Sequence, residues 1–130
     1  MIAAVETTEG VELVDVEEEV SLGAGSELPE RAAPRVELPR VVATAGAGST
    51  VVAVVERRPP LAISNDGGAT WREAGGGLPA GFAVAVAEDD PDRILYAARN
   101  RLYLSTDGGT FWRSLEPELA DVVAVAWVET

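Results

Sequence analysis

The sequence contains no cysteine, no histidine and no lysine, and only 5% of its residues are aromatic. Without cysteine the chain has no disulfide, no thiolate nucleophile and no cysteine-based metal site. Without histidine it lacks the most common general acid or base and the most common zinc ligand. Any catalytic chemistry would have to use carboxylates, tyrosine, serine, threonine or arginine. We therefore expect no metal and no cofactor.

Positive charge is also scarce, because 10 arginines oppose 22 aspartates and glutamates and the net charge is -12. This negative charge repels phosphate groups, so we expect neither nucleic acid nor an anionic membrane as a partner. No apolar run approaches the length of a membrane span, and the first residues lack the basic start of a signal peptide. These absences predict a cytoplasmic protein, although a secreted chain without its leader would look the same.

The sequence does contain an internal repeat. The segment Ser64–Trp71, SNDGGATW, recurs 41 positions later as STDGGTFW at Ser105–Trp112. The same offset places the apolar run at Leu61 over the one at Leu102, and Val41 over Phe82. Short apolar runs separated by Gly, Pro and Asp turns surround both segments. A period near 40 with four short strands per repeat is typical of β-propeller blades.

The repeat divides the chain into units. We expect four-stranded blades over residues 41–81 and 82–121, and the opening strand of a further blade over residues 122–130. Residues 1–40 contain no copy of the repeated segment, and they fit either a decayed blade or an acidic disordered arm. At 130 residues the chain is the size of one folding unit. The predicted fold is all-β, a partial β-propeller of two to three four-stranded antiparallel blades.

Both repeated segments match S-x-D-x-G-x-x-W, and residues 41–122 thereby resemble the Asp-box (BNR) propellers of sialidases, sortilin-type ectodomains and photosystem assembly factors. The glycines suit a tight turn, the aspartates and serines can bind backbone N–H groups, and the tryptophans can pack on the neighbouring hairpin. In the resembling families the box lies on the outer rim, away from the ligand. We predict a purely structural role for the eight box residues: Ser64, Asp66, Gly68, Trp71, Ser105, Asp107, Gly109 and Trp112.

The resemblance to sialidases also implies an enzymatic alternative, with arginines that hold the substrate, a tyrosine nucleophile paired with a glutamate, and an aspartate as acid or base. These groups come from all around a closed ring, and fewer than four blades are encoded here. Tyr96 and Tyr103 lie in the middle of expected strands, which predicts that they are packing residues. We therefore assign no catalytic residue.

Two charged clusters leave alternatives open. The acidic run Glu88–Asp92 offers oxygen ligands for Ca²⁺, but its spacing and Pro91 favour a solvated turn between strands. The pairs Arg57-Arg58 and Arg99/Arg101 fall on equivalent connections of the two repeats. They could bind an anion, or they could form surface and interblade ion pairs.

These observations predict a non-enzymatic binding or assembly module of unknown ligand. The alternative is a sialidase-like glycoside hydrolase or a fragment of one. Residues Val122–Val128 are almost wholly apolar, as in a strand covered on both faces. We expect this strand to complete a blade of a second copy, so that a protein partner or a homo-oligomer closes the propeller ring.

Overall fold

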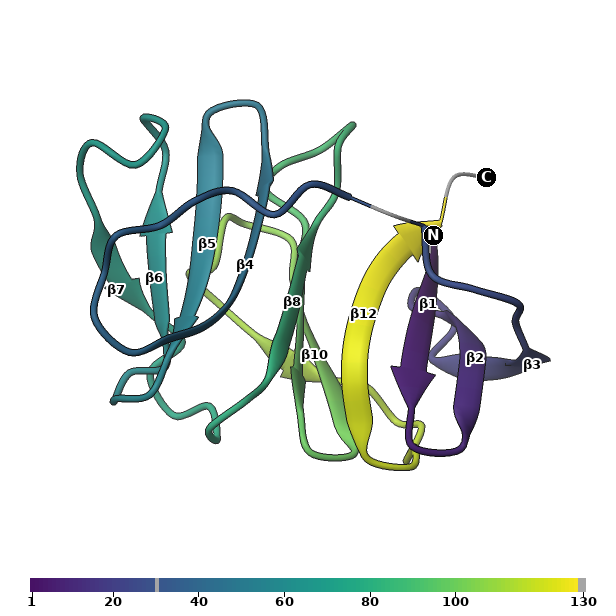
Figure 1. The fold of residues 1–130 in the computed structure, drawn as a ribbon. Coiled ribbons are helices and arrows are strands. Elements are labelled where there is room, and N and C mark those ends of the chain that lie inside the picture. Colours follow the sequence, from purple (N-terminus) through teal and green to yellow (C-terminus); the bar gives the residue numbers. More distant parts are fainter. Residues whose placement is uncertain (30, 129–130) are drawn as a thin grey trace.

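The fold comes from a computed structural model that describes residues 1–29 and 31–128. The described residues form twelve strands in three four-stranded antiparallel sheets (Figure 1). The prediction of an all-β, propeller-like fold with four-stranded blades is confirmed. Within the described ranges, no helix is long and apolar enough to cross a membrane.

Two of the sheets are each built from one stretch of chain. The first sheet contains β4 (Val41–Ala47), β5 (Thr50–Val55), β6 (Leu61–Ser64) and β7 (Arg72–Ala74) in that order. The middle sheet contains β8 (Ala83–Val86), β9 (Ile94–Ala98), β10 (Arg101–Ser105) and β11 (Arg113–Ser114). Their strands β5, β6 and β9 are nearly continuous apolar runs rich in Val, Ile and Leu, because both faces of these strands are buried.

The third sheet joins the two ends of the chain, and we call it the closing sheet. It contains β12 (Val122–Val128), β1 (Ile2–Thr7), β2 (Gly10–Asp15) and β3 (Val20–Ala24) in that order. Ile2 lies opposite Val128, and Ala4 lies opposite Ala126. The expected pairing of residues 122–128 with a second copy is therefore replaced by pairing within the chain, because β1 offers an apolar strand edge. Residues 129 and 130 of the expected strand lie outside the described residues.

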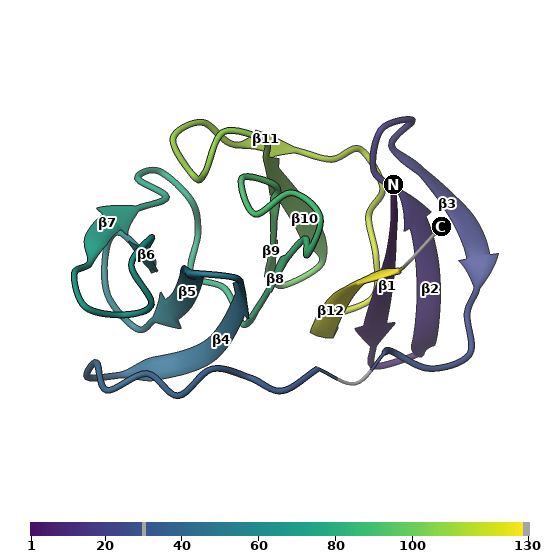
Figure 2. The same ribbon diagram turned by 90° about the horizontal axis from the view of Figure 1, so that it is seen from above.

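The three sheets pack against one another in a row, with the middle sheet between the other two (Figure 2). Side chains of the middle sheet alternate between two cores, as the twofold period of a strand requires. Toward the first sheet lie Val84, Val86, Ile94, Tyr96 and Ala98. Toward the closing sheet lie Ala83, Ala85, Leu95, Ala97, Leu102 and Leu104, and Trp127 of β12 joins this second core.

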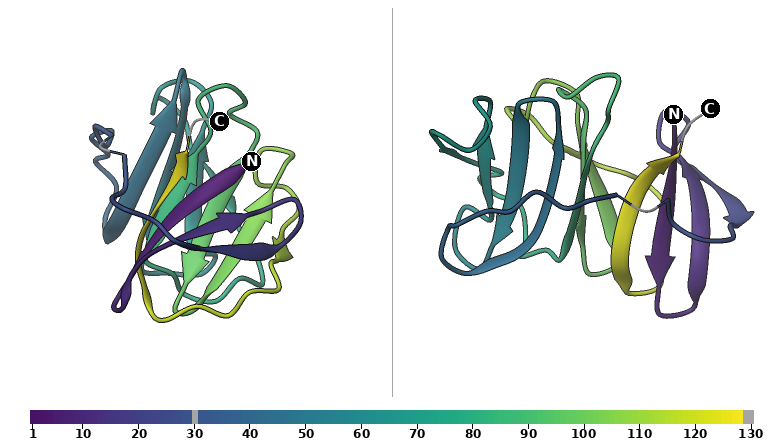
Figure 3. Two further views of the ribbon diagram at one scale, coloured as in Figure 1. Left: turned by 90° about the vertical axis from the view of Figure 1, so that its right-hand side faces the viewer. Right: turned by 45° about the horizontal axis from the view of Figure 1, so that its top comes forward.

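Residues 25–29 and 31–40 belong to a segment that we call the belt, which connects the closing sheet to the first sheet across β12, β8 and β4 (Figures 1 and 3). It leaves the closing sheet where the Gly25 N–H donates to the Val11 carbonyl. It reaches the first sheet where the Thr44 hydroxyl donates to the Pro34 carbonyl at 3.0 Å. Val36 and Leu38 then pack on the outer face of the first sheet. The chain therefore covers this outer sheet face itself.

Candidate functional site

The molecule has two ends with different properties. At the hairpin end, the turn of each repeated segment meets the first turn of its own sheet: Gly67 donates to the Ser49 carbonyl, and Gly108 donates to the Asp92 carbonyl. At the connector end lie the β5–β6 and β9–β10 turns and the connections that lead into β4, β8 and β12 (Figure 1). The eight box residues belong to the hairpin end, so any role they have is separate from the connector end.

In the first box, the side chains of Ser64 and Asp66 organise the turn. The Ser64 hydroxyl donates to Asp66 Oδ1 at 2.7 Å and accepts from the Gly68 N–H at 2.8 Å. The Thr70 hydroxyl and N–H both donate to the Asp66 carboxylate. These hydrogen bonds, with the Thr70 hydroxyl first, hold the pKa of Asp66 far below its usual range. Trp71 packs against the outer core that the belt covers.

The second box repeats this arrangement. Ser105 donates to Asp107 at 2.8 Å and accepts from the Gly109 N–H, while Asp107 also accepts from the Thr110 and Phe111 N–H groups. The Phe111 N–H and then the Ser105 hydroxyl lower the pKa of Asp107. The Trp112 indole donates to the Gly109 carbonyl, and its ring meets Tyr96 edge-on with centroids 6.2 Å apart.

The second box also joins neighbouring sheets. The Arg72 guanidinium of β7 donates to the Gly108 carbonyl at 2.6 Å. Gly109, at φ +93°, lies so close to the first sheet that a Cβ on it would be 2.4 Å from Cδ1 of Ile63. A side chain at this position would therefore push the first and middle sheets apart.

The acidic run at the hairpin end does not form a metal site. Within residues 1–29 and 31–128, no three carboxylates are grouped so that they could hold an ion. Asp90 instead accepts the Asp92 N–H, and its carbonyl accepts the Arg93 N–H, which closes a turn between β8 and β9. Glu88 makes an ion pair with Arg31 of the belt.

At the connector end, β4 and β12 each contain a β-bulge near their first residue. Val42 has no partner between the pairs that Val41 and Ala43 make with β5, and Val123 has none between the pairs that its neighbours make with β1. In the middle sheet, Ala83 is the partner of Ala97, and the N–H of Phe82, directly before β8, also donates to the Ala97 carbonyl. A bulge bends the strand and redirects the extra side chain. Val42, Phe82 and Val123 are accordingly among the most exposed large apolar side chains, at 40%, 54% and 52%.

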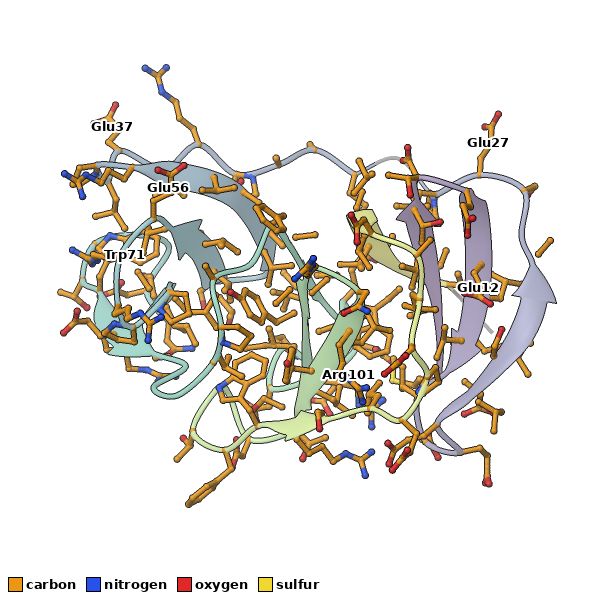
Figure 4. All side chains as sticks on the ribbon, turned by 90° about the horizontal axis from the view of Figure 1, so that it is seen from below. Glu12, Glu27, Glu37, Glu56, Trp71 and Arg101 are labelled. Atoms are coloured by element: carbon orange, nitrogen blue, oxygen red, sulfur yellow. The ribbon has the colours of Figure 1, made fainter. Side chains whose placement is uncertain are left out.

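A groove at this end contains Phe82 and is the candidate functional site; we call it the Phe82 groove. Its polar lining comes from the β9–β10 turn and from the connection into β12. The lining residues are Pro79, Ala80, Phe82, Ala98, Arg99, Asn100, Arg101, Tyr103, Asp121 and Val122. The backbone of this turn is fixed, since the carbonyls of Arg99 and Asn100 accept the N–H groups of Val122 and Leu119. Figure 4 shows the molecule from this end, with Arg101 over the middle sheet.

Tyr96 supports one wall of the groove from below. Its buried hydroxyl donates to the Pro79 carbonyl at 2.7 Å, and its ring contacts Tyr103 at 6.2 Å between centroids. Burial first, and then Tyr103, raise the pKa of Tyr96 to about 12. Tyr96 therefore stays protonated at neutral pH and holds the connection Pro79–Gly81 in place, whereas Tyr103 is partly exposed in the groove itself.

The sequence reasoning identified the arginines of the β9–β10 turn but missed Phe82 as a site residue. It placed Val41 over Phe82 at the 41-residue offset, whereas the strand pairing makes Val42 equivalent to Phe82. One signal in the sequence was an apolar residue directly before the first alanine of β4, β8 and β12, at positions 42, 82 and 123.

No protein-family model matches the sequence, and no curated protein is similar to it. Among solved structures, the chain is similar to the GH74 enzyme of Niastella koreensis, with 25% identical residues and a TM-score of 0.51. The match covers 93% of this chain but only 18% of that enzyme. The chain thus corresponds to a small part of a much longer glycoside hydrolase of the β-propeller kind.

This likeness contradicts the prediction that the chain is not an enzyme, because the same arrangement of sheets occurs within a glycoside hydrolase. The prediction relied on the missing histidine, cysteine and lysine and on the small number of blades. Glycoside hydrolysis needs none of these residue types, since two carboxyl groups perform it. The composition of this chain, with 22 carboxylates, therefore does not exclude that chemistry.

Proposed function

We propose that this chain is a glycan-binding segment of a propeller-like fold, with the Phe82 groove as its binding site. The exposed Phe82 ring, beside Arg99, Asn100 and Asp121, is the observation that carries the proposal. A flat aromatic ring can cover the apolar face of a sugar, and polar side chains around it can bind the hydroxyl groups. The likeness to a glycoside hydrolase supports glycans as the ligand class.

The hydrogen-bonded boxes support a more specific family assignment within this proposal. Each box uses its serine and aspartate to satisfy N–H groups of one tight turn, and both turns lie at the hairpin end. This arrangement agrees with the structural role that the resemblance to Asp-box propellers implies. It leaves the connector end as the surface for ligands.

Binding to a panel of soluble polysaccharides, measured by affinity electrophoresis and calorimetry, tests the proposed site. Phe82→Ala should abolish retention by the bound polysaccharide. Phe111→Ala is the matched control, because Phe111 is 76% exposed at the hairpin end. Equal loss of binding in both variants, or no binding to any glycan by the unmodified chain, would refute the proposal.

Hydrolysis of a glycosidic bond is a second candidate function, favoured by the likeness to the GH74 enzyme. Asp121 is the carboxylate among the groove residues, and a two-carboxylate mechanism needs a further acid beside it. Release of reducing ends from a bound polysaccharide should then fall by orders of magnitude in Asp121→Asn. Unchanged release in this variant would exclude Asp121 from the reaction.

A further inference from the structure

Charge is divided unevenly between the two ends of the molecule. The turns of the hairpin end carry Glu17, Glu18, Glu19, Asp66, Glu88, Asp89, Asp90, Asp92 and Asp107. The connector end of the first and middle sheets carries Arg40, Arg57, Arg58, Arg99 and Arg101, with Glu56, Glu118 and Asp121 as nearby acids. Glu56 and Arg101 mark this end in Figure 4. Arginines thus outnumber acids on this part of a chain whose net charge is -12, which lets an anion come close to it.

Most of these arginine side chains have no partner among the residues that the structure describes. Arg101 donates to Glu118 at 3.1 Å and to the Leu115 carbonyl. The side chains of the other four arginines make no hydrogen bond and no ion pair with any residue that the structure describes, and all four are exposed. Of the arginines for which surface or interblade ion pairs were the alternative, Arg101 alone makes an ion pair within the described part of the chain, with Glu118.

The backbone gives a second and independent indication. Arg40 and Arg99 have φ angles of 60° and 56°, a left-handed conformation that residues with long side chains rarely adopt. Glu19 has the same conformation, but its carboxylate accepts hydrogen bonds from Arg113 and from the Glu116 N–H. The side chains of Arg40 and Arg99 make no such contact within the described residues, whereas their carbonyls accept the N–H groups of Glu56 and Val122. Unfavourable backbone conformations of this kind cluster at ligand sites.

We infer that the connector end binds a carboxylate-bearing polysaccharide, a polymer of uronic acid residues. This inference depends on the proposed glycan binding and specifies the class of glycan. Phe82 covers the face of one sugar ring, and Arg99 beside it in the groove binds a carboxylate with its planar guanidinium. Arg57 and Arg58, at the equivalent turn of the adjacent first sheet, bind carboxylates farther along the same polymer.

Polygalacturonate and its fully methyl-esterified form provide the test, because the two polymers share a backbone and differ in charge. Calorimetry should give an affinity of the full chain for polygalacturonate at least about tenfold higher than for the ester. The triple variant Arg57→Gln, Arg58→Gln, Arg99→Gln should remove this preference. Arg93→Gln is the matched control, because Arg93 is an arginine of the hairpin end and should leave binding unchanged.

The outcomes separate this inference from the proposed function. Equal binding of the acid and the ester, with loss of both in Phe82→Ala, would overturn the preference for carboxylates and leave glycan binding intact. Equal binding of polygalacturonate and poly-glutamate, insensitive to Phe82→Ala, would overturn the assignment to a glycan and the proposed function with it. A loss in Arg93→Gln as large as in the triple variant would overturn the assignment to this end.

Discussion

The pairing of β12 with β1 within one chain leads to a sharp test, because the chain has no natural cysteine. Ala4 and Ala126 lie opposite each other in this pair and are buried. In the variant Ala4→Cys/Ala126→Cys, a disulfide should form within the chain and close a loop of 122 residues, from position 4 to position 126. Closure of a loop this long restricts the unfolded state and should raise the free energy of unfolding by up to about 4 to 5 kcal/mol.

Two measurements check this expectation. A non-reducing gel at low micromolar concentration should show a covalent monomer, and urea unfolding with and without reductant should give the gain in stability. The control Ala4→Cys/Ala53→Cys places the second thiol in β5, which lies beyond the middle sheet from β1, and it should form no bond within the chain. If Ala4→Cys/Ala126→Cys gave mainly covalent dimers, β12 would complete a neighbouring copy, and the pairing within the chain would be refuted.

Three further predictions follow from the packing and the titrating groups. Gly81→Ala should lower the free energy of unfolding by about 1 to 3 kcal/mol, because its Cβ would lie 2.3 Å from the buried Tyr96 ring; an unchanged urea midpoint would contradict this. The pKa values of Asp66 and Asp107 are lower in the folded chain, so as the pH falls these carboxylates are protonated in the unfolded chain before they are in the folded chain. Stability should therefore fall as the pH drops below about 4. Asp66→Asn/Asp107→Asn should flatten that decline in acid unfolding curves. Leu38→Asp should lower the free energy of unfolding and increase binding of a hydrophobic dye, because Leu38 of the belt packs on the outer face of the first sheet. Unchanged dye binding would contradict this cover.

The sequence predicts the strands of the first and middle sheets because the forces that form them are local. Apolar alternation, turn residues and the recurrence at 41 positions all agree for Leu61–Ser64 and Arg101–Ser105, and both are strands of the structure. The box turns are equally local, since Ser64 binds groups no more than four residues away. Short-range patterns of this kind determine a four-stranded blade without reference to the rest of the chain.

The closing sheet could not be predicted in the same way. Its central pair joins residues more than a hundred positions apart, and no local pattern in Val122–Val128 distinguishes pairing with β1 from pairing with another copy. The equivalence of Val42 and Phe82 escaped prediction for a different reason. The β8–β9 turn is longer than the β4–β5 turn and the β9–β10 turn is shorter than the β5–β6 turn, so the repeat offset is 41 at Leu61 but 40 at Val42. An alignment with a constant offset therefore misplaces the residue equivalent to Phe82.

The division of the molecule into two ends implies that folding and binding can be changed separately. Phe82 and Arg99 make no side-chain hydrogen bond within the described residues, and both side chains are exposed. Their replacement by Ala and Gln should therefore change the free energy of unfolding by no more than about 0.5 kcal/mol. Ser105→Ala should cost about 1 to 3 kcal/mol, because the buried Ser105 hydroxyl bonds both Asp107 and the Gly109 N–H. Urea unfolding of the three variants decides between these expectations. Loss of stability in Phe82→Ala as large as in Ser105→Ala would show that the Phe82 groove is part of the core and not a surface kept for a ligand.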